Sequence, residues 1–291
     1  MELRVLQYFL AVAREHSISG AAQSLHLSQP TLSRQLKEME EELGKQLLIR
    51  GNRRVTLTEE GMILRKRAEE IIELVRKAED EISLSDENIA GDITVGAGET
   101  DGVRFLTRAA QAVQKDHPLV HFHIISGDKA SVIESMDKGL IDFGLVFGEI
   151  DTARYETIPL PYKDTWGVLM RRDSPLADKE NISPEDLWDK PLITSRQAFH
   201  GLELQEFFQC ETDKLNVVGT YNLLFNGSLM VDNGMGYALC LDNIINVSGD
   251  SSLCFKPFSP KLEAEICIAW TKYQVLTKAA QKFLQKLQET I

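Results

Sequence analysis

The chain has 291 residues, of which 43% are hydrophobic and 26% charged, a composition typical of a globular protein with room for two or three domains. This composition excludes general disorder and small disulfide scaffolds, and no run of about eighteen apolar residues is present to span a membrane. The net charge of −12 is unusual for a nucleic-acid binder, but residues 1–60 carry eight basic and eight acidic residues, so most of the acidity lies later. Four widely spaced cysteines and no cleavable signal pattern lead us to expect a reduced, cytoplasmic protein without membrane contact.

Three short helices are predicted at the start of the chain. Apolar residues at helical spacing mark residues 2–15, and a break at residues 16–20 separates them from a short segment over residues 21–25. A third helix follows, because Ser28 is a suitable N-cap, the proline at position 30 fits a first helical turn and Gly44 is a plausible end.

The third predicted helix separates its polar groups along its length. Amide, hydroxyl and cationic side chains lie near its N-terminal end, whereas its acidic side chains gather toward the C-terminal end. A helix that enters the DNA major groove by its N-terminal end needs this polarity, since Gln and Arg can bond adenine and guanine edges. A solvated face on an ordinary helical hairpin would show the same pattern. The candidate DNA contacts here are Ser28, Gln29, Pro30, Thr31, Ser33, Arg34 and Lys37.

Residues 50–57 are predicted to form a tight two-stranded turn. The Gly-Asn pair at positions 51–52 supplies the left-handed conformations that such a turn requires. Arg50, Arg53 and Arg54 on this turn suit contact with the DNA backbone or minor groove, although they would also solubilise a hairpin tip. Three helices followed by a basic hairpin form a winged helix-turn-helix.

A long helix is predicted from a cap at Thr58 to about Glu87. Its apolar residues are spaced alternately by four and three positions, which is the 3.5-residue repeat of a helix that pairs with another helix. We expect this seam to form a dimer, with docking on its own domain as the alternative. The seam residues are Leu64, Ala68, Ile71, Val75, Ala78 and Ile82.

From Gly91 onward, apolar runs alternate with helical stretches. This alternation predicts an α/β domain of parallel sheets covered on both faces, and periodicity alone leaves open whether it has one sheet or two lobes. We expect strands at residues 93–97, 120–125, 141–147, 166–170, 192–193, 215–218, 237–241 and 266–270, and helices at 103–115, 129–138, 201–210, 223–232 and 276–289.

The first sixty residues resemble the LysR-type transcriptional regulators. The resemblance implies that the third helix lies in the major groove, that the wing meets the DNA backbone and that the long helix dimerises. It also implies an activator or repressor that is often a tetramer, with a double-stranded DNA operator as partner and RNA polymerase as a further candidate partner. The residues that carry it are Ala21, Ala22, Leu25, Ser28, Gln29, Pro30, Leu32, Ser33, Leu36, Glu40, Leu43, Gly44, Leu47, Arg50, Thr58 and Gly61.

The remainder resembles the effector domain of that family more loosely, through residues 142–146, 174–177 and 231–236. The implied architecture is an N-terminal all-α winged helix-turn-helix (residues 1–58), a linker and dimerisation helix (59–90), and a C-terminal α/β effector domain (91–291). This domain would have two periplasmic-binding-protein-like lobes, lobe I over residues 91–161 and 267–291 and lobe II over 162–266. The chain would cross between them near Tyr162 and Glu265.

Ligands of parallel α/β sheets bind beyond the carboxyl ends of the strands, near helix N-termini. We therefore expect a small polar metabolite between the lobes, with no other cofactor. Each hydroxyl there could instead cap its own helix, and the carboxylate of Glu99 leaves the charge of the effector open. The expected effector contacts are Glu99, Thr100, Ser126, Gly127, Phe147, Gly148, Ser195, Arg196, Tyr221 and Asn222.

Other site chemistries have weaker support. His121 and His123 share one face of a predicted strand without a third metal ligand, and the cysteine spacing does not favour a redox pair. No phosphate-binding loop, nucleophile elbow or zinc-protease motif is present. We therefore predict a sequence-specific transcriptional regulator of the LysR type that is not an enzyme, controlled by an effector bound between two lobes. An α/β enzyme with a fused regulatory winged helix is the alternative.

Overall fold

The computed structural model describes residues 1–51, 54–83, 89–199, 202–209 and 215–291. The chain forms two compact units, Met1–Leu84 and Ser85–Ile291. Among the helices in the described ranges, none is both long enough and apolar enough to cross a lipid bilayer.

The first unit is the predicted winged helix-turn-helix with a long following helix. Ser17 caps the second helix by accepting a hydrogen bond from the Gly20 backbone N–H at 3.1 Å, so that helix begins earlier than expected. Arg53 at the hairpin tip and the expected end of the long helix at Glu87 lie outside the described residues. The elements are α1 (Leu3–Glu15), α2 (Ile18–Ser24), α3 (Gln29–Leu43), the antiparallel strands β1 (Leu48–Arg50) and β2 (Val55–Leu57), and α4 (Glu59–Ser83).

The core of this unit fixes the orientation of α3. Phe9 of α1 and Leu32 and Leu36 of α3 are fully buried in one cluster, and Ala68 of α4 closes the same cluster. Pro30 lies in the first turn of α3, and Gly44 ends the helix with a left-handed backbone at φ 62°. The opposite face of α3 is thereby held toward solvent.

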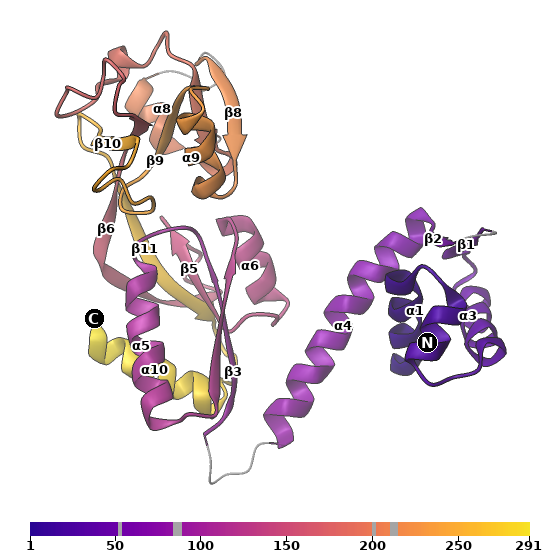
Figure 1. Ribbon diagram of the computed structural model, residues 1–291. Helices are drawn as coiled ribbons and strands as arrows, with labels where there is room; N and C mark the ends of the chain where they lie inside the picture. Colours follow the sequence, from indigo (N-terminus) through magenta and orange to yellow (C-terminus); the bar gives the residue numbers. More distant parts are fainter. Residues whose placement is uncertain (52–53, 84–88, 200–201, 210–214) are drawn as a thin grey trace. The chain divides into compact units, whose positions relative to one another are not determined.

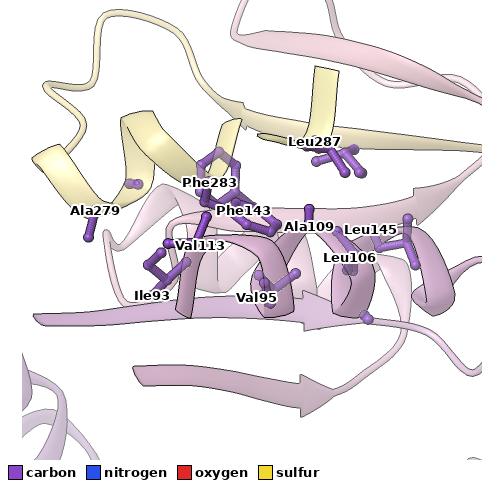
Figure 2. Close-up of a cluster of buried hydrophobic side chains, with 14 of the residues drawn as sticks. Ile93, Val95, Leu106, Ala109, Val113, Phe143, Leu145, Ala279, Phe283 and Leu287 are labelled. Carbon is purple, nitrogen blue, oxygen red and sulfur yellow. The ribbon is translucent and has the colours of Figure 1, made fainter. Parts of the chain in front are cut away.

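The second unit has two lobes, and lobe I contains the first part of its sheet. β3 pairs in parallel with both β4 and β5. Figure 2 shows the core, where Phe143 and Phe283 meet between the sheet and the helices α5 and α10 that cover it. The elements of lobe I are β3 (Gly91–Ala97), α5 (Val103–Asp116), β4 (Val120–Ser126), α6 (Lys129–Asp137), β5 (Phe143–Phe147) and α10 (Lys278–Thr290).

Two long strands connect the lobes: β6 (Tyr155–Arg171) and β11 (Glu263–Thr271) run antiparallel from one lobe into the other (Figure 1). Their register shifts between Glu265 and Cys267, which pair with Lys163 and Pro159 respectively. This irregularity lies where the crossing was expected.

Lobe II continues the sheet, with β7 parallel to β8 and β9, and β9 antiparallel to β6. The expectation of purely parallel sheets is therefore wrong, because the crossing strands run opposite to their neighbours. The strand β10, which pairs with β6, was not predicted. The elements of lobe II are η1 (Pro184–Asp186), β7 (Leu192–Ser195), α7 (Arg196–Phe199), α8 (Leu202–Phe208), β8 (Val217–Tyr221), α9 (Leu224–Asp232), β9 (Tyr237–Leu241) and β10 (Leu253–Pro257).

Gly61 allows α4 to pack closely on the wing. A Cβ atom at this position would lie 2.2 Å from the carbonyl oxygen of Leu47, a backbone atom that cannot rotate away. We expect Gly61→Ala to destabilise the first unit by about 1–3 kcal/mol, measured by chemical unfolding. Gly20→Ala is the matched control, because its Cβ would meet its nearest neighbour at 3.4 Å inside a helix, where alanine is favoured by up to about 1 kcal/mol. Equal stability of Gly61→Ala and the wild type would contradict the close packing.

Candidate DNA-contacting surface and inter-lobe site

The N-terminal half of α3 presents an exposed polar surface. Ser28 caps the helix, since its hydroxyl oxygen accepts a hydrogen bond from the Thr31 backbone N–H at 3.3 Å. Gln29, Arg34 and Lys37 are exposed along the following turns. Among the described residues, Arg34 and Lys37 form ion pairs only with acids one turn later on α3, at 3.7 and 3.4 Å. Such exposed pairs contribute roughly 0–1 kcal/mol, so these cations can exchange their partners for phosphates at little cost.

The wing is linked to α3 by Arg50. Its guanidinium donates a hydrogen bond to the Ser33 hydroxyl at 3.1 Å and lies 3.9 Å from the carboxylate of Glu40. Glu40 in turn accepts hydrogen bonds from the backbone N–H groups of Leu47 and Leu48. Arg50 and Ser33, both predicted DNA contacts, therefore also position the wing, whereas Arg54 is exposed.

The predicted seam of α4 divides into two parts. Ala68 is 0% exposed and Leu64 packs with it against the core of the same unit, so Ala68 cannot contact a partner helix. The alternative of docking on its own domain is correct for this first stretch. The part of the seam left on the surface begins at Ile71, which is 37% exposed, and ends at Ile82, which is 85% exposed. Val75 and Ala78 lie between them.

The lobes of the second unit contact each other through two helix N-termini. The carboxylate of Glu99, after β3, accepts a hydrogen bond from the Leu224 backbone N–H in the first turn of α9. The Lys129 backbone N–H in the first turn of α6 donates to the side-chain oxygen of Gln197 at 3.3 Å. Burial raises the pKa of Glu99 above its ordinary value, and the Leu224 hydrogen bond opposes this shift. A group of lobe I thus already occupies the N-terminus of α9.

A buried carboxyl group lies on the crossing strand β6. Asp164 is 0% exposed and accepts a hydrogen bond from the Thr100 hydroxyl at 2.5 Å. Burial raises the pKa of Asp164 to about 6, and the Thr100 hydroxyl opposes this rise. Tyr162, Asp164 and Trp166 alternate along the strand, and each has a buried polar atom without a hydrogen-bond partner among the described residues, as does Thr194. Such atoms are rare in native proteins, so this junction can gain hydrogen bonds if the lobes or a bound molecule rearrange.

The structure assigns two of the expected effector contacts to other tasks. Tyr221 is buried in lobe II, where its hydroxyl donates to the Leu239 carbonyl at 2.8 Å, so its side chain faces the core and its contact with an effector stays a prediction. Ser195 caps α7 by accepting from the Ala198 N–H at 3.0 Å. Glu99 and Thr100 form the inter-lobe hydrogen bonds described above. The remaining six are exposed or half-buried at the strand ends: Ser126, Gly127, Phe147, Gly148, Arg196 and Asn222.

Three polar residues of the junction were missed by the sequence reasoning. Asp164 directly precedes an apolar strand, and no spacing distinguishes it from an exposed acid. Asp242 accepts a hydrogen bond from the Thr165 backbone N–H at 2.9 Å, across the strands β6 and β9. Gln197 lies in α7, a short helix that was not predicted. Their proximity depends on strands far apart in the sequence.

The described residues contain no group of three or more His, Cys, Asp or Glu side chains that could hold a metal ion. His121 and His123 are both exposed on β4, as expected for an outer strand face. His123 lies 3.6 Å from the carboxylate of Asp92 on the neighbouring strand.

Comparison with known proteins shows the same two-part organisation. A model described as the LysR substrate binding domain matches residues 86–291, and one described as a bacterial regulatory helix-turn-helix protein of the lysR family matches residues 3–62. The chain belongs to the LysR family. This LysR-type chain is therefore a DNA-binding transcriptional regulator with an effector-binding domain, as the sequence predicted.

Individual relatives extend this assignment. The LysR-type chain is 30% identical to the HTH-type transcriptional regulator BsdA of Bacillus subtilis over 249 residues, 79% of this chain and 83% of that protein. It is 25% identical to the regulator BudR of Raoultella terrigena over 291 residues, covering 98% and 99% of the two chains. The crystal structure of full-length CbnR with its target DNA has the same fold, with a TM-score of 0.78, 18% identity and full coverage of both chains.

The raised pKa of Asp164 predicts how stability depends on pH in this LysR-type regulator. The native state binds this proton more tightly than the unfolded chain, so the stabilisation is present below about pH 4 and is lost as pH rises through about 6. Asp164→Asn keeps an acceptor for Thr100 and removes the titration. We expect the wild type to lose about 2 kcal/mol relative to this variant between about pH 4 and pH 7, measured by urea unfolding. A difference that is constant across this range would show that Asp164 does not titrate as its burial requires.

Proposed function

We propose that this LysR-type regulator reads its operator with the N-terminal half of α3 and holds the DNA backbone with the wing. The observation that supports this most strongly is the exposed row of Gln29, Arg34 and Lys37 on the helix to which Arg50 of the wing is hydrogen-bonded through Ser33. Gln and Arg side chains can discriminate base edges, while arginines on a wing suit phosphates. The assigned role is binding in the cytoplasm, without turnover of a substrate.

The surface part of the α4 seam supports a dimer as the DNA-binding form. Ile71 and Ile82 are large apolar residues left exposed on a charged helix, and pairing this stretch with a second copy would bury them. A dimer would place two copies of α3 at half-sites about one helical turn apart. Tetramer formation and contact with RNA polymerase remain further proposals for this chain.

The proposed effector is a small polar metabolite that binds between the lobes and changes how they meet. The support comes from two of the contacts between the lobes, from Glu99 to α9 and from α6 to Gln197, which are single hydrogen bonds that a ligand can replace. The partnerless buried atoms beside Asp164 offer further hydrogen bonds. A ligand that favours one arrangement of the lobes shifts the population toward it, and the DNA-binding unit then responds.

The proposed division of labour predicts two different mutant behaviours on DNA. Arg54→Ala should reduce the slope of log affinity against log salt by about 2, because a dimer would lose two phosphate contacts at about 0.9 each. Gln29→Ala should leave this slope unchanged and weaken discrimination at one base pair by about 1–3 kcal/mol. Both quantities follow from fluorescence anisotropy with a selected operator and its single-base variants.

The matched control for the DNA experiment is Arg108→Ala, an exposed arginine on α5 of the second unit. It should change neither the slope nor the discrimination. An unchanged slope in Arg54→Ala would remove the wing from the DNA interface, and unchanged base preference in Gln29→Ala would remove α3 from the reading role.

The effector proposal predicts that a bulky side chain at the end of β4 blocks binding. Ser126 is exposed there, so Ser126→Trp can occupy the space between the lobes without disturbing a core. Metabolites that raise the melting temperature of the wild type should bind this variant at least tenfold more weakly in isothermal titration calorimetry. Thr107→Trp, at an exposed position on α5, should bind them like the wild type. Equal binding by both variants would place the effector elsewhere.

A further inference from the structure

Lobe II contains a pocket of about 410 Å³ that includes none of the expected effector contacts. It lies between the first turn of α9, the strands β6, β9 and β10, and the segment that follows β9. Its volume falls within the range of about 300–1,000 Å³ typical of small-molecule sites. The lining residues are Thr165, Leu169, Leu224, Cys240, Leu241, Asp242, Asn243, Ile245, Val247, Phe255, Pro257 and Lys261.

The chemistry of the lining divides the pocket into an apolar interior and a polar rim. Eight of its residues are aliphatic, aromatic, proline or cysteine, and burial raises the pKa of the Cys240 thiol far above its ordinary value, which keeps it neutral. An interior of this kind favours a single aromatic ring or a branched aliphatic group, because its surface is removed from water on binding. The few polar groups of the pocket would then determine which ligands it binds.

The rim favours a hydrogen-bond donor on the ligand. The Asp242 carboxylate accepts from the Thr165 backbone N–H at 2.9 Å and from the Asn243 side-chain amide at 3.0 Å, and a carboxylate has about four acceptor sites in all. The cation at the rim, Lys261, is paired with Glu263 at 2.6 Å. Because Glu263 neutralises Lys261, the carboxylate of Asp242 makes the mouth favour an ammonium or hydroxyl group over an anion.

The pocket touches two of the three places described above where a hydrogen bond ties lobe II to lobe I. Thr165 follows Asp164, whose carboxylate bonds to Thr100 of lobe I. Leu224 also lines the pocket, and its backbone N–H donates to Glu99 of lobe I. A molecule in the pocket would therefore contact Leu224 and Thr165, which belong to or adjoin the hydrogen bonds between the lobes.

We propose that this pocket is a second ligand site, which takes a small aromatic or branched apolar molecule with a hydroxyl or ammonium group and modulates the arrangement of the lobes. It is separate from the proposed effector site between the lobes. Coupling between two binding sites is reciprocal. A ligand in this pocket should therefore change the affinity for an inter-lobe effector by the same factor as the effector changes the affinity for that ligand.

The test uses the full chain and three probes of similar size: phenol and benzylamine, which carry a donor, and benzoate, which is an anion. We expect the first two to bind with dissociation constants of about 1 mM in saturation-transfer NMR titrations, and benzoate at least fivefold more weakly. Val247→Phe fills the pocket and should weaken phenol and benzylamine at least tenfold. The matched control is Val218→Phe, which makes the same substitution at a 44% exposed position of the same lobe and should leave binding unchanged.

A second variant covers the case in which Val247→Phe does not fold. Asp242→Asn should weaken benzylamine at least fivefold and leave phenol within twofold, because only the ammonium group depends on the carboxylate charge. Absence of phenol and benzylamine binding to the wild type would overturn the proposal, and so would equal binding by the filled and control variants. These measurements need neither DNA nor effector, so they stand apart from the tests of the proposed function, and Ser126→Trp should bind both probes like the wild type.

Discussion

The two strands that cross between the lobes are the constraint on which the effector domain depends. β6 and β11 each contribute to both lobes, so any change in how the lobes meet must be absorbed at their crossing point. The register there already shifts between Glu265 and Cys267, and the buried carboxyl of Asp164 lies on the facing strand, bonded to Thr100. A buried polar junction loses stability when some of its groups lack hydrogen-bond partners. Its arrangement is therefore sensitive to a molecule that binds beside it and supplies such partners.

The DNA-binding unit uses its polar residues differently. In α3 the apolar stripe is buried by α1, and the remaining surface is free to carry side chains for recognition. Arg50 shows that a single residue can serve two purposes, since the contact with Ser33 that fixes the wing also holds a cation beside α3. Likewise the seam residues Leu64 and Ala68 of α4 pack into the core of their own unit, whereas Ile71 and Ile82 further along the seam are exposed. Folding and recognition thus share the same short elements.

Local rules predicted the N-terminal unit well. Caps, the position of a proline in a first turn and helical spacing act over a few residues, so Ser28, Pro30 and Gly44 mark the limits of α3 without knowledge of the rest. The α/β unit was predicted in outline, but β10 was missed and the sheet is mixed rather than parallel. Strand direction depends on which distant segments pair, and periodicity within one segment carries no information about this.

The sequence by itself determined the family, the two-part organisation, and which side chains of α3 and the wing face outward, because these follow from short-range spacing and from motifs. Only the tertiary structure decided that Asp164 is buried against Thr100, that the phenol of Tyr221 faces the core of lobe II, and that Glu99 occupies the N-terminus of α9. Each of these facts joins residues 18 to 125 positions apart along the chain. Burial and pairing over such separations result from packing of the whole domain, so a residue's neighbours in sequence could not reveal them.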